Sequence, residues 1–175
     1  MRDRLGVAEE KYAAGMDEMS LNVIASPLQN VRDAFDLMPQ DTDEHWRTIA
    51  IRMAKVPTAM AQYAESLTLA RSRGDVAPRR QVDACIAQCR DLTTDDGYFV
   101  TLVAEAKAGD QALDPEVKRD LAAAAEAARA AYVQIADFLE TELAPVAPAA
   151  DACGRERYAL HSRDFVGAVV DLEET

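Results

Sequence analysis

The sequence predicts an all-α protein, an irregular bundle of about seven or eight helices, and three observations support this fold class. Apolar residues recur at helical spacing through most of the chain. Proline or a capping serine, threonine or aspartate stands where most of these stretches begin. No segment shows sustained apolar–polar alternation, and only residues 168–172 are compatible with a short extended stretch. The 49% hydrophobic fraction suffices for a core, and the length predicts a single domain over 1–175.

The first two predicted helices differ in how clearly they begin. Residues 2–18 form the first, with an apolar stripe at helical spacing, and an extended connector covers 22–25. The second begins with a capping box, because Gln29 follows Ser26 by three residues, and Pro27 takes the first helical position. The two predicted stripes are Leu5, Ala8, Tyr12 and Met16, then Leu28, Val31, Phe35 and Leu37 or Met38 before Pro39 ends the helix.

Two further helices follow in the first half of the chain. Thr42 caps the third helix, whose first turn carries two acidic residues that its dipole favours. Pro57 begins a fourth helix after a bend at Val56, and Gly74 is a natural C-terminal cap. The expected buried residues are Trp46, Ile49, Ala50, Met53, Met60, Tyr63, Ala64 and Leu67.

The second half is predicted to contain a long spine helix at 115–143. Asp114 caps it and Pro115 opens it, and its stripe is Val117, Leu121, Ala124, Ala128, Tyr132, Ile135 and Leu139. Before it, Pro78 opens a helix with the face Val82, Cys85, Ile86 and Cys89, and a short helix covers 98–107 before Gly109. After the prolines of 144–150, a last helix covers 152–166.

The charge of the chain restricts its partners. The formal net charge is -12, with a pI of about 4.6. Nucleic acid and anionic membrane surfaces are therefore not expected as partners, because both need a basic face. Three cysteines do not make a disulfide framework, the N-terminus lacks a signal peptide, and no apolar run is long enough to span a membrane, so we expect a cytoplasmic protein.

No catalytic or metal-binding constellation is visible in the sequence. The two histidines, His45 and His161, begin no H-E-x-x-H pattern. Cys85 and Cys89 lie one turn apart and could share a metal, but their apolar helix face favours core packing. Cys153, at a helix start, would be a nucleophile only with a base beside it. We therefore assign no catalytic residue, no metal ligand and no cofactor to this chain.

Several arginines are candidates for a cleft or an interface. Arg79 and Arg80 stand at a helix start, where the dipole disfavours cations. Arg155 and Arg157 flank a glutamate, and guanidinium groups clamp carboxylates. His161 and Asp164 are spaced to meet on one helix face. The alternatives for the arginines are an internal salt-bridge network that ties helices together and a face toward a substrate cleft. The candidate cleft or interface residues are Arg79, Arg80, Arg155, Arg157 and His161.

Three segments resemble the first half of a large bacterial family, common in actinobacteria and catalogued as a domain of unknown function. They are LNVIASPLQNVRDAFDLMP (21–39), VAPRRQV (76–82) and DACGRERYALHSRDFVGAVVDLEET (151–175). The full-length family resembles all-helical zinc metallopeptidases similar to carboxypeptidase Taq and the oligopeptidases. Its metal motif, H-E-x-x-P-G-H-H, lies beyond the matched segments, so no zinc ligand is carried over. His161 and Asp164 stand where the family more often places aromatic residues.

The resemblance implies that this chain is a helical scaffold, a fragment of a longer metallopeptidase-like domain. By that reading it is not an enzyme alone, and zinc belongs only to the full-length family. Its partner would be the remainder of the parent domain, or a second copy through an exposed apolar face. The alternative is a stand-alone module that binds a partner helix in an apolar groove, and a small-ligand pocket in the bundle is a third possibility. A substrate is not predicted.

Overall fold

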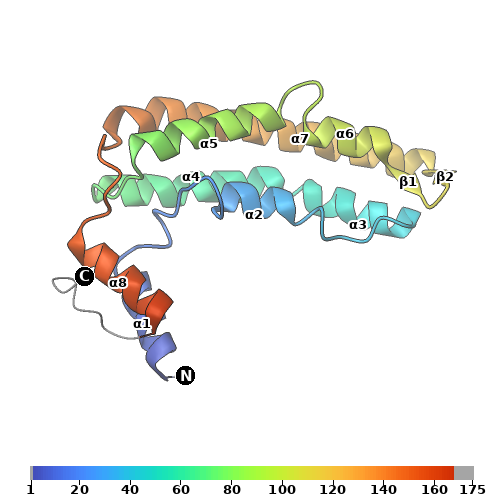
Figure 1. The fold of residues 1–175 in the computed structure, drawn as a ribbon. Coiled ribbons are helices and arrows are strands. Elements are labelled where there is room, and N and C mark those ends of the chain that lie inside the picture. The colour runs from blue at the N-terminus through green and yellow to red at the C-terminus, as the bar shows by residue number, and fades with distance from the viewer. Residues whose placement is uncertain (1, 168–175) are drawn as a thin grey trace.

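The computed structural model describes residues 2–167 and confirms an all-α fold (Figure 1). The predicted extended stretch at 168–172 lies outside the described residues. A two-stranded antiparallel hairpin interrupts the helices. The elements are α1 (Arg2–Ala13), α2 (Pro27–Asp33), α3 (Asp43–Met53), α4 (Val56–Ser72), α5 (Arg79–Leu92), α6 (Tyr98–Glu105), β1 (Lys107–Ala108), β2 (Gln111–Ala112), α7 (Pro115–Phe138) and α8 (Arg155–Val166).

The helices form an elongated bundle with a projecting arm (Figure 1). The helices α5 and α6 follow one another along α7, and α3 and α4 follow one another on the opposite side, with α2 laid over α4. The spine α7 packs against α3, α4, α5 and α6 and so joins the two rows. The first and last described helices, α1 and α8, contact each other outside this bundle, and we call this pair the arm.

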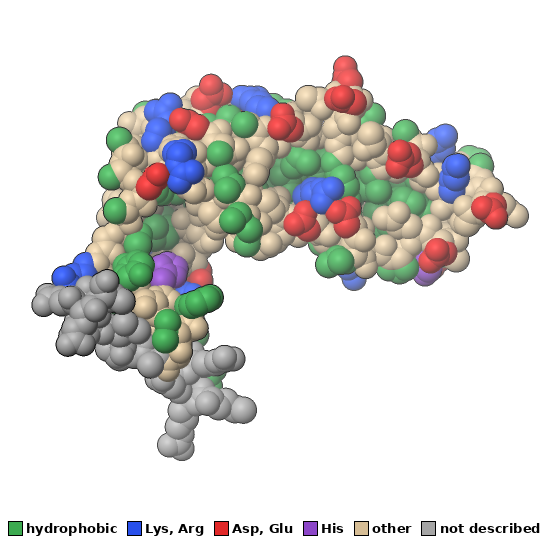
Figure 2. All heavy atoms as spheres, in the orientation of Figure 1, with side chains coloured by type: hydrophobic (Ala, Val, Ile, Leu, Met, Phe, Trp, Pro, Cys, Tyr) green, Lys and Arg blue, Asp and Glu red, His purple; other side chains and the backbone are tan. Residues whose placement is uncertain are grey.

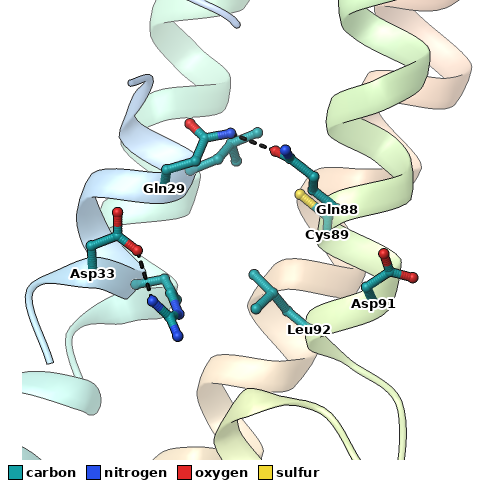
Figure 3. Close-up of a pocket in the computed structure, with 8 residues that line it drawn as sticks. Gln29, Asp33, Gln88, Cys89, Asp91 and Leu92 are labelled. Atoms are coloured by element: carbon teal, nitrogen blue, oxygen red, sulfur yellow. Dashed lines mark hydrogen bonds and ion pairs between the residues drawn. The ribbon is translucent and has the colours of Figure 1, made fainter. Parts of the chain in front are cut away.

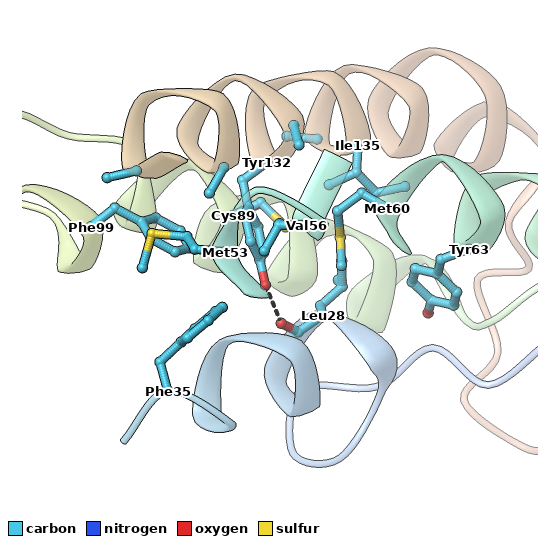
Figure 4. Close-up of a cluster of buried hydrophobic side chains, with 14 of the residues drawn as sticks. Leu28, Phe35, Met53, Val56, Met60, Tyr63, Cys89, Phe99, Tyr132 and Ile135 are labelled. Atoms are coloured by element: carbon cyan, nitrogen blue, oxygen red, sulfur yellow. Dashed lines mark hydrogen bonds between the residues drawn. The ribbon is translucent and has the colours of Figure 1, made fainter. Parts of the chain in front are cut away.

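The spine helix matches its prediction closely. All seven residues of its predicted stripe are buried. The helical path continues beyond α7 as a π-helical turn (Leu139–Leu143) and a 3-10 turn (Ala144–Val146). Tyr132 points from α7 toward α2, where its hydroxyl donates to the Leu28 carbonyl at 2.7 Å, and its ring lies 5.5 Å from that of Phe99 (Figure 4). Alanines elsewhere on the buried face let neighbouring helices approach the spine.

The predicted caps are present. The Ser26 N–H and hydroxyl both donate to Oε1 of Gln29, at 2.9 and 2.6 Å, and the Ser26 residue is fully buried. The Thr42 hydroxyl accepts from the backbone of His45 at 3.2 Å, and the Asp114 carboxylate accepts from the backbone of Glu116 at 2.8 Å. The bonds from the backbone N–H groups of Ser26, His45 and Glu116 satisfy donors that a helix start leaves open.

The first predicted helix and its stripe are wrong in part. The helix α1 ends at Ala13, and Leu5 and Tyr12 are 63% and 70% exposed, whereas Val7 and Met16 are buried. The reason is that α1 packs mainly on α8, and a single short neighbour covers only a narrow strip of a helix. In the second helix, Leu37 is 88% exposed because α2 ends early and turns follow it.

Two other boundaries differ from the prediction. The short helix ends at Glu105, and residues 107–112 turn back as the β1–β2 hairpin around Gly109, whose φ is +62°. The indole N–H of Trp46 donates to the Lys107 carbonyl at 2.7 Å and fixes this hairpin to α3. The last helix begins at Arg155 rather than residue 152, after an extended approach to Gly154.

Candidate functional site

The arm meets the bundle through charged side chains, and two of the predicted arginines lie there. The Arg157 guanidinium on α8 pairs with Asp75 in the loop after α4, and Asp75 also lies 3.6 Å from Arg73. Arg80, at the start of α5, pairs with Asp151 at 2.9 Å, in the segment that leads to α8. Both arginines therefore belong to an internal salt-bridge network, which was one of the two predicted alternatives, and they join the arm to the bundle.

The other predicted residues lie apart from this junction or on the open face of α8. The Arg79 side chain holds Asp83 through its Nε at 2.8 Å and donates from Nη1 to the Ala144 carbonyl at 3.0 Å. It therefore ties α5 to the end of the spine. Arg155 and His161 are exposed on α8. A cleft role for any of the five stays a prediction.

The arm is held together by charge pairs while its large apolar side chains face outward. The Lys11 ammonium lies 2.8 Å from Asp164, and Arg163 lies 2.8 Å from Glu10. No described residue of α8 is buried, and Phe165 is 94% exposed. We call the outward apolar residues of the arm its apolar face: Leu5, Tyr12, Tyr158, Phe165 and Val166. Exposed apolar groups in one region typically mark an interaction site.

A pocket of about 290 Å³ opens between α2 and α5. Figure 2 shows hydrophobic side chains gathered in the hollow between the α5–α6 row and the helices α2 and α3, where this pocket lies. Across the pocket, Nε2 of Gln29 donates to Oε1 of Gln88 at 2.6 Å (Figure 3). Gln88 in turn donates to the Val23 carbonyl at 3.1 Å. The amide groups of Gln29 and Gln88 therefore hydrogen-bond to other parts of the protein, and these bonds join α2 and its connector to α5.

The charged and sulfur groups of this pocket are poorly suited to chemistry. Arg32 pairs with Asp33 at 2.9 Å and lies 4.0 Å above the Tyr98 ring, so its charge is already shared. Burial raises the pKa of the Cys89 thiol from 9.0 to about 12, so the thiol stays protonated at neutral pH. The pocket therefore presents apolar surface and a satisfied amide pair, without an activated nucleophile.

The predicted core role of the two helix-face cysteines is confirmed. Cys85 and Cys89 are 0% and 1% exposed beside buried Val82, and all three cysteines are free. Burial raises the pKa of the Cys85 thiol from 9.0 to about 11. Cys153 is exposed in the segment before α8. Among residues 2–167, no group of three His, Cys, Asp or Glu side chains is placed to hold a metal ion. That the chain binds no metal stays a prediction.

A thiol reagent is expected to distinguish these cysteines. At pH 8 a maleimide should modify only Cys153 in the native protein and all three thiols in denaturant, because the reactive thiolate is excluded from the core. Mass spectrometry counts the adducts. Rapid native modification of two or three thiols would contradict this core assignment.

The same two buried thiols make the stability of the fold depend on pH. Since Cys85 and Cys89 keep their protons to higher pH when folded, their contribution to stability is complete below pH 9 and is lost as pH rises through about 11 and 12.

The fold and these surfaces define an all-helical bundle protein with a projecting arm and no membrane-spanning helix among its described residues. The chain matches the family model of DUF885, a bacterial protein of unknown function, over residues 1–175, and it belongs to that family. No curated protein matches the chain. The family match confirms the expected membership in a bacterial family of unknown function.

Proposed function

We propose that this chain is the helical scaffold of a metallopeptidase-like protein and is not catalytic by itself. In this proposal the zinc ligands and the reacting groups belong to other polypeptide of the parent protein, which packs on the apolar face of the arm. The observation that carries the proposal is this face, where Phe165 is 94% exposed on a helix with no buried residue. A helix so poorly covered gains most of its stability only when a partner packs on it.

The contacts among the three resembling segments support the proposal. The Val23 backbone N–H, in the first segment, donates to Oε1 of Gln81, in the second, at 3.2 Å. Arg80, also in the second, pairs with Asp151, in the third, at 2.9 Å. The residues that carry the resemblance therefore meet across α2, α5 and the approach to α8. Such contacts are consistent with the proposed role of these segments as a structural framework.

The scaffold role defines what the parent protein would do. An all-helical wall beside a zinc centre limits access to peptides that fit between the helices, so the proposed substrate class is peptides. The proposed compartment is the cytoplasm, which agrees with three free cysteines. The residues of the arm junction, Arg80 and Arg157, would then set the angle at which the apolar face meets its partner.

Metal analysis and activity assays test the proposal. The purified chain should contain no stoichiometric zinc and should not hydrolyse a library of fluorogenic peptides, because residues 2–167 bring no zinc ligand set together. The parent protein with its H-E motif should do both. Stoichiometric zinc together with peptide turnover by residues 1–175 alone would overturn the scaffold assignment.

A charged substitution on the arm tests the docking step separately. Phe165→Asp should change the stability of the isolated chain by less than about 0.5 kcal/mol, since the side chain is exposed. In the parent protein the same change should lower both thermal stability and peptidase activity, because it places a carboxylate in an apolar contact. Glu9→Gln, on the exposed side of α1, is the matched control. Equal effects of both changes in the parent would remove the arm from the interface.

A further inference from the structure

A second apolar surface lies on the bundle, away from the arm. It is a groove of about 490 Å³ between α2 and the junction of α3 and α4, and we call it the α2–α4 groove. Its floor contains the buried Phe35 and Val56 and the part-buried Val31 and Met38. Ala34 and Ala59 also line it, and such small side chains let another backbone come close.

The shape of the groove fits a third helix. One wall is formed by residues 27, 30, 31 and 34, and the other by 52, 55, 56 and 59. The first set follows the spacing by which α2 presents one face, over two turns or about 10 Å, whereas the second runs from the end of α3 across the turn at 54–55 into the first turns of α4. A helix that packs in a groove between helical segments inserts its own side chains between theirs. The groove is therefore shaped for an amphipathic helix.

The charged residues at the rim of the groove indicate what kind of helix would bind there. Most described arginines pair with carboxylates, as Arg79, Arg90 and Arg129 do. Arg52 and Lys55 are both exposed at the groove rim, and neither has an ion-pair partner among the described residues. These two neighbouring cations without a described ion pair form a locally basic spot in a chain of net charge -12. They favour an occupant with carboxylates at the edge of its apolar stripe.

The net negative charge of the chain does not override this local pair. Charges are screened beyond about 8 Å at physiological ionic strength, so the rim cations dominate at contact distance. A second copy of the chain is a poorer fit. Its exposed apolar helices lack an excess of carboxylates, because α1 has as many basic as acidic residues and α8 has one more basic than acidic residue.

We propose that the α2–α4 groove binds an amphipathic helix of a partner protein whose apolar stripe is flanked by glutamate or aspartate. Apolar side chains at i, i+3 or i+4, and i+7 of that helix would cover Val31, Phe35 and Met38. Its carboxylates would meet Arg52 and Lys55. This site is independent of the arm and of the scaffold role, so each can fail without the other.

Fluorescence anisotropy with three synthetic helices tests the proposal. The peptides share one leucine stripe over about 18 residues, or five turns, and carry Glu, Gln or Lys at the flanking positions. The Glu peptide should bind about tenfold more tightly than the Lys peptide, since two partly exposed charge pairs are changed. Equal binding of the Glu and Lys peptides, or binding of none, would overturn the proposal.

Variants of the chain locate the binding and its charge preference. The double substitution Arg52→Gln with Lys55→Gln should remove the preference for the Glu peptide and leave the Gln peptide unaffected. Lys107→Gln with Lys118→Gln, which changes two other cations that lack a described ion pair, is the matched control and should preserve the preference. Ala34→Trp fills the groove and should abolish binding of all three peptides.

The oligomeric state distinguishes the remaining occupant. Sedimentation of the chain alone should show a monomer, with or without Ala34→Trp. A dimer that Ala34→Trp dissociates would assign the groove to a second copy and overturn the proposed partner. A preference for the Glu peptide that survives Ala34→Trp would place the binding elsewhere and would equally contradict the proposal.

Discussion

Replacement of Tyr132 by alanine is expected to lower the free energy of unfolding by about 3–5 kcal/mol, as for other large buried aromatics. The side chain is fully buried at the centre of the bundle, where it joins α7 to α2 and packs on the ring of Phe99 (Figure 4). Alanine would leave a cavity between three helices and would remove the hydroxyl that donates to the Leu28 carbonyl. Urea denaturation followed by circular dichroism measures the loss.

Phenylalanine at the same position separates the hydroxyl from the ring. Tyr132→Phe keeps the packing and removes one hydrogen bond, so its cost should be about 1 kcal/mol. The Leu28 carbonyl also lies within α2, so it is not left without a helical donor. A Phe variant as unstable as the Ala variant would show that the hydroxyl, rather than the ring, holds α2 on the spine.

Gly97→Ala is expected to lower the free energy of unfolding by about 1–3 kcal/mol, the usual cost of overpacking. Gly97 precedes α6 and is buried, and an added Cβ would lie 2.6 Å from the Leu92 carbonyl oxygen. That neighbour is backbone at the end of α5, so it cannot rotate away as a side chain would. The turn between α5 and α6 would have to open, which would disturb the position of Phe99 in the core.

Gly6→Ala is the control for this substitution. Gly6 lies inside α1, and an added Cβ would meet no atom within 4 Å. The change should therefore stabilise the helix by about 0.5–1 kcal/mol through the lower entropy of alanine in the unfolded chain. Helicity and the urea midpoint check both variants. If Gly97→Ala has the same urea midpoint as the unmodified chain, the α5–α6 turn can accommodate a Cβ, and the predicted clash with the Leu92 carbonyl is wrong.

Sequence periodicity predicted the bundle well because its strongest signals are local. The stripe of α7 and the caps at Ser26, Thr42 and Asp114 need only neighbouring residues to be recognised. The stripe of α1 was misjudged because burial depends on what covers a helix, and α1 has little besides α8. The β1–β2 hairpin has strands of two residues, which are too short to show any alternation.

The candidate site was less accessible to sequence reasoning. Arg157 and its partner Asp75 are 82 residues apart, so their pairing depends on the tertiary fold. The location of the α2–α4 groove was not predicted from the sequence, because its walls come from three helices. One local signal was available for it. Arg52 and Lys55 have no acidic residue three or four positions away, whereas Arg79 has Asp83.

The arm has a consequence for the order in which the chain acquires its structure. Glu10 and Arg163 are 153 residues apart in sequence, and bringing such distant positions together from an unfolded chain carries a large entropic cost. Once α2 to α7 have associated, the segments that lead to α1 and α8 leave the bundle at the same end and the remaining search is short (Figure 1). The terminal pair should therefore be the last element to assemble and the first to exchange its amide protons, which leaves it the easiest part of the molecule for a partner to reposition.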